Sequence, residues 1–505
     1  MSPLTLTLLI PLITAGMIAL LSGEDRRAPY RIALAGAALL FLSCFSIAFH
    51  FASAESVEGF RFLQESPWIP RLGLSYLVGV DGISLFLLLL TGIVTLAAVG
   101  VSSGVEDRPR EFFIHLMLIS AGAVGAFISL DLFFLYVFHE LALIPTFLLI
   151  GRWGNHANRE RVATKLTVYL SLGSLILLAG LLMFYFLSPV TAEGTHTFNL
   201  ITLRSLLLTP QYIPGSIQPL IYGFVLVGSG ILISLWPFHS WAPQGYAGAP
   251  AAASMLHAGV LKKFGLYLLI RFAEPLLPQG AQSWVTILSV LLLMNILYVG
   301  YVAMSEKNLR LMLGYSSVSH MGYVFLGIVA ANSLGLTGAL VYMFAHGLTA
   351  ALGFALAGHI ARQTGTVDTG ELGGLARKMP FAAVVFTMTA MASAGMPGFA
   401  NFAGELMIFF GAWYTEPALP FHGAVVVLAL FGVVVSSVYM LRAVRNVFLG
   451  ELPEKFSGVR DIEGLQERLP YLLLLAGLMI TGFVPGLLTS PITSSLHGWM
   501  NLLGK

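Results

Sequence analysis

The run from Leu132 to Gly151, LFFLYVFHELALIPTFLLIG, is long and apolar enough to cross a bilayer as one helix, yet it carries Glu140 near its middle. A charged side chain at that depth costs about 3 kcal/mol on insertion scales. Such a group is kept where it faces a polar interior, and it commonly serves transport. The run therefore favours a membrane protein whose helices enclose ionisable groups.

The composition of the whole chain agrees with this interpretation. Of its 505 residues, 57% are hydrophobic and 10% are charged, against about 25% charged residues in a soluble domain. The composition thus excludes an ordinary soluble enzyme. The N-terminus, MSPLTLTLLIPL, lacks the basic segment that opens a secretory signal peptide, so we expect it to be retained as a helix.

Little in the sequence is suited to binding a cofactor. The single cysteine, Cys44, can form neither an iron–sulfur cluster nor an internal disulfide. The sequence has no complete GxGxxG motif after a strand and no Walker A loop. We expect no cofactor in this chain and no nucleic-acid partner, and we expect the lipid bilayer to surround it.

Apolar windows of about 20 residues recur along the chain and predict an all-α polytopic membrane protein with about fourteen transmembrane helices. The window 380–412 is too long for one straight crossing and contains GMPG, and the window 218–240 ends in WPFHSWAP. Because proline interrupts the helical hydrogen-bond ladder, we expect the seventh and twelfth helices to be broken. The windows are 3–22, 31–52, 82–103, 111–130, 132–151, 164–188, 218–240, 251–271, 284–304, 311–331, 334–360, 380–412, 420–448 and 469–488.

Lysine and arginine fall mainly in alternate loops. Of the 26 such residues, 19 lie in loops that follow odd-numbered windows, and five, with Arg271 among them, are assigned to the opposite side. Cytoplasmic loops carry the excess of lysine and arginine. The alternation predicts cytoplasmic basic loops and both termini on the outer face.

The two broken helices lie five helices apart, which predicts two inverted five-helix repeats. Interrupted segments at matching positions of two halves indicate a transport site near the bilayer midplane. We expect four parts: 1–110 with helices 1–3, 111–272 with helices 4–8, 273–449 with helices 9–13, and 450–505 with a cytoplasmic loop and helix 14.

Two adjacent lysines, Lys262 and Lys263, lie midway along the apolar run SMLHAGVLKKFGLYLLIRF. Adjacent residues diverge by about 100° on an α-helix, so we expect that only one of them faces an ion path. The alternative for either is a side chain that extends to the membrane surface. His257, in the same run, is at least as easily explained by packing.

Further ionisable groups follow in later windows. Glu405 comes after the break at Pro397, where free backbone amides and carbonyls suit an ion path. His320 and His346 can relay protons, since the ordinary pKa of histidine is about 6.5. The alternatives are a paired structural carboxylate and satisfied packing histidines. Neither histidine has a cysteine or carboxylate at ligand spacing, so no metal site is expected.

Together these stretches resemble the antiporter-like subunits of respiratory complex I, most nearly subunit M (chain 4) of bacterial NADH:quinone oxidoreductase. The resemblance covers nearly the whole chain in order and rests on VDGISLFLLLLTG, FHELALIPTFLLIG, ATKLTVYLSLGSL, WPFHSWAP, AGVLKKFGLYLLIRF, NLRLMLGYSSVSHMGY, ELGGLARKMP and GMPGFANFAGELMIF. Multisubunit cation/proton antiporters and membrane-bound hydrogenases share this family.

The resemblance implies a proton-translocating subunit, without redox chemistry of its own, in the bacterial inner membrane. NADH, FMN, iron–sulfur clusters and quinone would belong to partner subunits. The other membrane subunits of the same complex would also be partners of this chain. The family's proton-path glutamate falls on Glu140, its central lysine on Lys263, its relay histidines on His320 and His346, and its exit glutamate on Glu405. Lys262 stands where the family usually has leucine.

One position departs from the family. The lysine usual in the broken seventh helix, in a Lys-x-Pro context, is replaced here by Leu232, with Ser234 two residues later. Lys262 or His257 is a candidate substitute, and Lys262 is the stronger candidate for a displaced partner of Glu140. Two alternative functions stay open: a subunit of a cation/proton antiporter, and a structural paralogue with impaired pumping.

Overall fold

The computed structural model describes residues 2–21, 26–155, 158–191, 194–206, 212–415 and 422–502. Residue 22 of the first predicted window, residues 420–421 of the thirteenth, and Lys505 lie outside these ranges. The α-helices are α1 (Pro3–Ala19), α2 (Ala28–His50), α3 (Gly82–Gly100), α4 (Pro109–Ile128), α5 (Leu132–Trp153), α6 (Arg159–Leu187), α7 (Leu200–Leu206), α8 (Gln218–Ile233), α9 (Trp241–Gly248), α10 (Ala251–Leu256), α11 (Lys263–Leu268), α12 (Glu274–Leu276), α13 (Pro278–Leu293), α14 (Gly300–Ser305), α15 (Leu309–Val329), α16 (Ser333–Thr364), α17 (Pro380–Ser393), α18 (Ala400–Trp413), α19 (His422–Phe448), α20 (Gly464–Phe483) and α21 (Gly486–Leu502).

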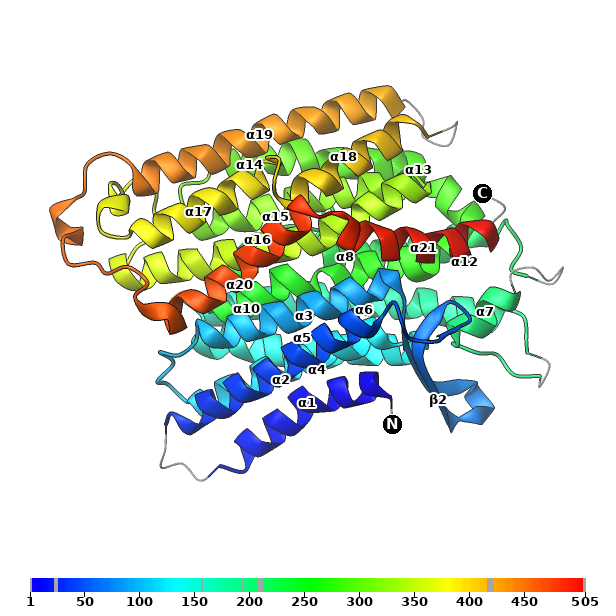
Figure 1. Ribbon diagram of the computed structural model, residues 1–505. Helices are drawn as coiled ribbons and strands as arrows, with labels where there is room; N and C mark the ends of the chain where they lie inside the picture. Colours follow the sequence, from blue (N-terminus) through cyan, green and yellow to red (C-terminus); the bar gives the residue numbers. More distant parts are fainter. Residues whose placement is uncertain are drawn as a thin grey trace.

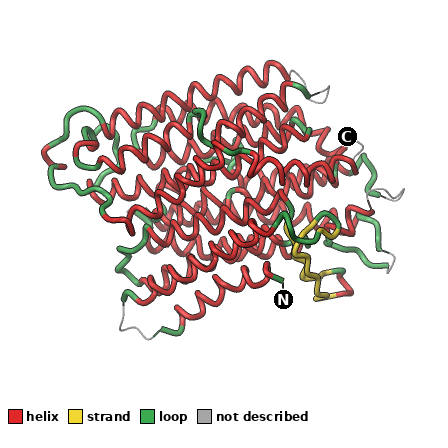
Figure 2. The backbone as a smooth tube through the Cα atoms, in the orientation of Figure 1, coloured by secondary structure: helices red, strands yellow, loops and turns green. Residues whose placement is uncertain are grey.

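Most of these helices run side by side in one bundle (Figure 1). The two termini lie at the same end of the bundle, together with the small sheet and α7. The loops before α17 and after α19, which carry several of the basic residues, lie at the opposite end, and Figure 2 shows them in green. This arrangement agrees with the alternation of basic loops in the sequence.

Eleven helices in the described ranges are long and apolar enough to cross a membrane, or up to twelve when α20 and α21, bent by 68°, count as one span. Pro3–Ala19 and Pro380–Ser393 are shorter apolar helices. The predicted all-α membrane fold is confirmed as a fold class. Length and composition identify fewer than the fourteen predicted spans. The first helix, α1, has only 17 residues, and the twelfth predicted helix is divided into α17 and α18.

A small antiparallel sheet follows α2, where the sequence predicted no helix. Its strands are β1 (Ser56–Val57), β2 (Phe60–Ile69) and β3 (Leu74–Val80), in the order β1-β2-β3, with the 3-10 turn η1 (Pro70–Leu72) between the last two. Asp131 caps α5 by accepting bonds from the amides of Phe133 and Phe134, and it also accepts one from Ser75 of β3. The sheet is thus tied to the start of the helix that carries Glu140.

The seventh predicted helix is broken between α8 and α9. Ser234 ends α8 with a φ of 68°, and the peptide bond between Trp236 and Pro237 is cis. Asn295 holds the break: its side chain accepts a bond from the Trp236 amide at 2.6 Å and donates to the Ser234 and Val318 carbonyls. Asn295 lies in the π-helical segment η4 (Met294–Val299) that follows α13.

The twelfth predicted helix is divided into α17 and α18. Gly395 and Gly398 in the connection have φ angles of 68° and 98°, where a β-carbon is unfavourable, so glycine suits both positions. Pro397 between them removes an amide donor. Both breaks expected from the sequence are therefore present.

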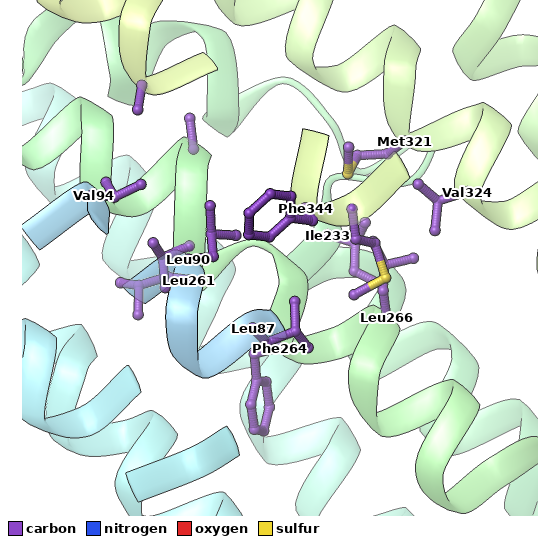
Figure 3. Packing of buried hydrophobic residues seen from close by; sticks show 14 of the residues in the cluster. Leu87, Leu90, Val94, Ile233, Leu261, Phe264, Leu266, Met321, Val324 and Phe344 are labelled. Carbon is purple, nitrogen blue, oxygen red and sulfur yellow. The ribbon is translucent and has the colours of Figure 1, made fainter. Parts of the chain in front are cut away.

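The interior around these breaks is apolar and closely packed. Figure 3 shows Leu87 and Leu90 of α3 with Leu261 and Phe344, and Ile233, at the end of α8, with Leu266, Met321 and Val324. The predicted eighth helix runs through this interior as α10, the π-helical segment η2 (His257–Leu261), α11, the π-helical segment η3 (Leu269–Ala273) and α12. All of the most apolar window of this helix is buried.

Candidate proton path

Lys263 is fully buried and contacts the helix that faces it. Its Nζ donates to the Ala258 carbonyl at 2.6 Å and lies 3.0 Å from Nδ1 of His346 in α16. An amine and an imidazole nitrogen at this distance share a hydrogen bond, along which a proton can pass directly. The predicted central lysine and one predicted histidine are thus in contact.

Lys262 is also buried, with 1% of its surface exposed, and it does not extend to the membrane surface. Its Nζ donates to the carbonyl and hydroxyl of Ser317 in α15, at 3.1 and 3.3 Å, and lies 5.6 Å from the centre of the Tyr246 ring. The tyrosine face stabilises a cation in that position.

Both lysines are buried and reach different helices, Lys262 towards Ser317 and Lys263 towards His346, and the expectation that only one of them faces an ion path stays a prediction. The amide of Lys262 bonds to the carbonyl of His257, five residues back, so the turn before the lysines is wider than an α-turn. Because α15 and α16 pack against each other, two long side chains from this turn reach adjacent helices. Both amines contribute to one polar cluster.

His320 of α15 and His346 of α16 lie next to each other. Their ring centres are 5.7 Å apart, and the rings are perpendicular. Both side chains are 2% exposed, and Nε2 of His320 is a buried polar atom without a partner among the described residues. Buried polar groups are nearly always hydrogen-bonded, by water where no side chain serves. Lys262, Lys263, His320 and His346 therefore form one cluster, which we call the central cluster.

Glu405 lies beyond the histidines, in α18, and is 5% exposed. Its carboxylate is electrostatically coupled to Tyr342 and Tyr323, whose buried hydroxyls make no hydrogen bond to a described residue. The two tyrosine rings are 5.9 Å apart and each lies 6.1 Å from the His320 ring. Two tyrosines thus occupy the space between the central cluster and Glu405.

The carboxylate of Glu405 also packs directly on the broken helix. A β-carbon built on Gly395 would lie 2.1 Å from Oε2 of Glu405. The glycine in the break therefore makes room for the carboxylate. This contact joins the predicted break and the predicted glutamate in one local structure.

Glu140 has a different environment. Its side chain is 37% exposed on this chain, so the expectation of an enclosed carboxylate does not hold for the isolated chain. It accepts a hydrogen bond from Ser174 of α6, and Nδ1 of its neighbour His139 lies 3.5 Å from Oε1. Lys262 does not bind Glu140, so the direct pair expected from the loss of the seventh-helix lysine is not formed.

Two further buried histidines, His139 and His257, lie in this part of the bundle. His139 is 5% exposed and stacks on Phe264 of α11, with ring centres 3.9 Å apart. His257 is 5% exposed, lies 5.5 Å from the Trp241 ring, and has neither ring nitrogen bonded to a described residue. It interacts electrostatically with His139 and with both lysines. A packing role alone leaves the buried ring nitrogens of His257 unexplained.

Leu232 and Ser234, which the resemblance marks as departures, lie at the first break. Leu232 is 4% exposed in the last turn of α8, and the Ser234 hydroxyl donates to the Ile233 carbonyl. Neither residue places a charge at the break. His239, just beyond it, interacts with Lys262 and with Lys165.

Sequence reasoning missed the buried ion pair between Asp81 and Arg271. Both guanidinium nitrogens of Arg271 bond to the Asp81 carboxylate, at 2.5 and 2.6 Å, and the two residues are 0% and 2% exposed. Arg271 is thus a core residue, and its assignment to an outer loop is wrong. A signal was present, since Arg271 stands within an apolar run and Asp81 immediately precedes another.

Within the described ranges, no three histidine, cysteine or acidic side chains are grouped as a metal site requires. The polar interior described above consists of proton-exchanging groups in helices α5, α11, α15, α16 and α18 and in η2. Their arrangement is chemically suited to proton transfer along the middle of the bundle.

Comparisons with known proteins relate this arrangement to a family. Residues 129–436 match the family described as "NADH:quinone oxidoreductase/Mrp antiporter, TM". The NAD(P)H-quinone oxidoreductase chain 4 1 of Synechococcus elongatus is 35% identical, over 96% of this chain and 89% of the relative. The chain 4 protein of Gloeobacter violaceus is 33% identical, over 98% of this chain and 92% of the relative.

Two solved structures share the fold over nearly the whole chain. One chain of respiratory complex I from Thermus thermophilus with bound NADH superposes with a TM-score of 0.87 at 28% identity, covering 99% of this chain and 100% of that one. A chain of the Mrp complex from Dietzia sp. has a TM-score of 0.82 at 22% identity, covering 98% and 97%. At that identity the second match establishes the fold alone.

Proposed function

Because the chain belongs to the membrane-subunit family shared by NADH:quinone oxidoreductases and Mrp antiporters, we propose that it is a proton-translocating membrane-arm subunit of an NAD(P)H:quinone oxidoreductase. One observation carries this function within the chain: buried lysines and histidines gather in one cluster in the bundle interior, and a buried glutamate lies beyond two tyrosines next to it. A structural spacer does not need to bury such groups, since each is costly within a membrane.

The proposed path begins at Lys263. Its amine passes a proton to Nδ1 of His346 across their 3.0 Å contact. From His346 the proton reaches His320 through a rotation of a ring or through one water molecule, because the rings are 5.7 Å apart. Glu405 receives it beyond Tyr342 and Tyr323. Each step joins groups that exchange protons in the physiological range when their surroundings change.

Lys262 makes the central cluster sensitive to charge. Two buried amines and two imidazoles interact electrostatically, and no carboxylate in the described part of the chain bonds directly to either lysine. Charging all of them at once would be very costly, so arrival of a proton at one group favours departure from another. This coupling offers a way for signals from neighbouring subunits to drive transfer.

Glu140, His139 and His257 form the proposed connection to the other half of the chain. The exposed edge of Glu140 lies on a surface that we propose is covered by another membrane subunit, since partners belong to the function of relatives in this family. His139 and His257 lead inward from it towards Lys262. This route replaces the path through the missing lysine at Leu232.

The redox groups of the complex are proposed to lie in other subunits. NADH, FMN, iron–sulfur clusters and quinone would bind there, and this chain would contribute no redox centre. We further propose the inner membrane of a bacterium as the location, with basic loops in the cytoplasm and both termini outside. We also propose that 111–272 and 273–449 are inverted repeats, and the presence of one break in each, α8–α9 in the first and α17–α18 in the second, supports this division.

The alternative as an antiporter subunit draws on the fold shared with the Mrp complex. Relatives 33% and 35% identical carry quinone oxidoreductase names, and this favours the redox complex. The alternative as a structural paralogue draws on Leu232, which lacks the charge expected at the first break. The central cluster and Glu405 argue against that alternative.

Isolation of the intact complex in a mild detergent tests the assignment. We expect that affinity purification through a tag on this chain yields subunits with flavin and iron–sulfur absorbance and NAD(P)H:quinone reductase activity. A complex of antiporter subunits that moves Na⁺ or K⁺ against protons, without such absorbance, would contradict the proposal.

A further inference from the structure

Two adjoining cavities lie at the end of the bundle that carries the basic loops. The first has a volume of about 440 Å³ and is lined by residues from the ends of α3, α15, α16 and α20, among them Arg310, Gly358 and Arg362. A neighbouring cavity of about 420 Å³ shares Asn155, Arg310 and Arg362 with it. We call these two the vestibule.

A smaller cavity lies deeper, beside the central cluster. It has a volume of about 20 Å³ and is lined by His320, His346 and the hydroxyl side chains of Ser316, Ser317, Thr349, Thr389 and Ser393. A cavity needs about 10–15 Å³ and two to four polar partners to hold one water molecule. The unpartnered Nε2 of His320 is the kind of group that a water molecule there would satisfy.

The wall between the vestibule and this inner cavity is about one helical turn thick. Along α15, Arg310 lines the vestibule and Leu313 lines the inner cavity, three residues or about 4.5 Å further in. Along α16, Gly358 lines the vestibule and Phe354 the inner cavity, four residues or about 6 Å further in. Because α15 and α16 run in opposite directions, Leu313 lies deeper in the bundle than Arg310, and Phe354 lies deeper than Gly358.

The wall is apolar where the two helices meet. Leu313 and Phe354 are 7% and 2% exposed. A β-carbon built on Gly353 would lie 3.3 Å from Cδ2 of Leu313, so this side chain packs closely on α16. The Phe354 ring is held by an edge-to-face contact with Tyr246, whose face also receives Lys262. One aromatic residue thus links the wall to the charge of the cluster.

We propose that Leu313 and Phe354 form an apolar gate through which water and protons pass between the vestibule and the central cluster. This proposal deepens the proposed function and rests on it. An apolar constriction stops conduction while it is dry and allows it when wetted. A change in charge at Lys262 alters its attraction to the Tyr246 ring, and Tyr246 in turn supports Phe354. The gate therefore opens in step with the protonation of the cluster.

Cysteine labelling in the intact complex tests the gate. The variant Thr389→Cys, in a Cys44→Ala background, places one thiol of this chain in the inner cavity. We expect it to react slowly with membrane-impermeant 2-sulfonatoethyl methanethiosulfonate added to the face that carries the basic loops. Adding Leu313→Ala and Phe354→Ala should raise the rate of labelling at least tenfold. Asn155→Cys in the vestibule supplies the reference for an open position.

Matched truncations distinguish a gate from a loosened core. Leu326→Ala in α15 and Phe344→Ala in α16 remove side chains of equal size that are 0% and 1% exposed and line neither cavity. They should leave the labelling of Thr389→Cys unchanged. Fast labelling with the gate intact, no gain in the gate variants, or an equal gain in the matched pair would each overturn the proposal. Labelling does not require pumping, so a failed gate and a failed functional assignment give different results.

Discussion

Replacing Gly395 by alanine should displace the Glu405 carboxylate while leaving its charge in place. The new β-carbon would lie 2.1 Å from Oε2, whereas carbon–oxygen contacts normally settle at about 3.3 Å or more. The carboxylate must therefore move by about 1 Å. Alanine at the φ of 68° adds a backbone cost of about 1–2 kcal/mol.

A shift of this size is enough to disturb proton transfer. Transfer requires groups within about 2.6–3.2 Å of each other or of one bridging water, and misplacing a reacting group by about 1 Å can cost about 100-fold in rate. Protons translocated per electron should fall in Gly395→Ala to the same level as in a Glu405→Gln variant measured alongside it. The assay is NADH-driven proton uptake by the complex in proteoliposomes, normalised to electron flow.

Gly398→Ala is the matched control. Its φ of 98° is also unfavourable for alanine, but its β-carbon would have no heavy atom closer than 3.4 Å, on Phe483. We expect Gly398→Ala to lower thermal stability about as much as Gly395→Ala does, with proton yield retained. A normal yield in Gly395→Ala, or an equal loss in Gly398→Ala, would refute the role assigned to the position of Glu405.

Three further predictions concern other parts of the chain. Lys262→Leu should lower proton transport several-fold, since it removes an amine that contacts Ser317; a normal proton yield would show that Lys262 is not part of the path. Asp81→Ala should destabilise the chain by about 3–5 kcal/mol, because Arg271 loses the carboxylate that binds both of its nitrogens. The measurement is the amount of assembled complex on native gels, and Asp81→Leu combined with Arg271→Met should recover part of the lost stability. Asn155→Cys should react with an impermeant thiol reagent from the cytoplasmic face only, and labelling from outside intact cells would reverse the assigned orientation.

Sequence reasoning worked best where one local pattern decides the structure. Apolar windows, prolines and glycines predicted the helices and both breaks, because helix length and the loss of amide donors are local properties. The groups of the central cluster were also foreseen as ionisable residues in membrane windows. Their mutual contacts depend on helix packing, which no single window contains.

The failures have physical causes of the same kind. The wide turn before Lys262, where its amide bonds to the His257 carbonyl, was not expected from the sequence. The pairing of Asp81 with Arg271 joins residues 190 positions apart. The 37% exposure of Glu140 depends on which helices pack beside α5. Each of these depends on tertiary or quaternary packing.

The central claim is that protons pass through the buried lysine and histidines of this chain, and Lys263→Ala tests it most directly. The measurement is the number of protons translocated per electron by the purified complex in proteoliposomes, compared with the amount of assembled complex. We predict a clear fall in protons per electron with assembly largely preserved, since the substitution removes the amine that contacts His346 and keeps the helix. A normal proton yield in fully assembled Lys263→Ala complex would contradict the account.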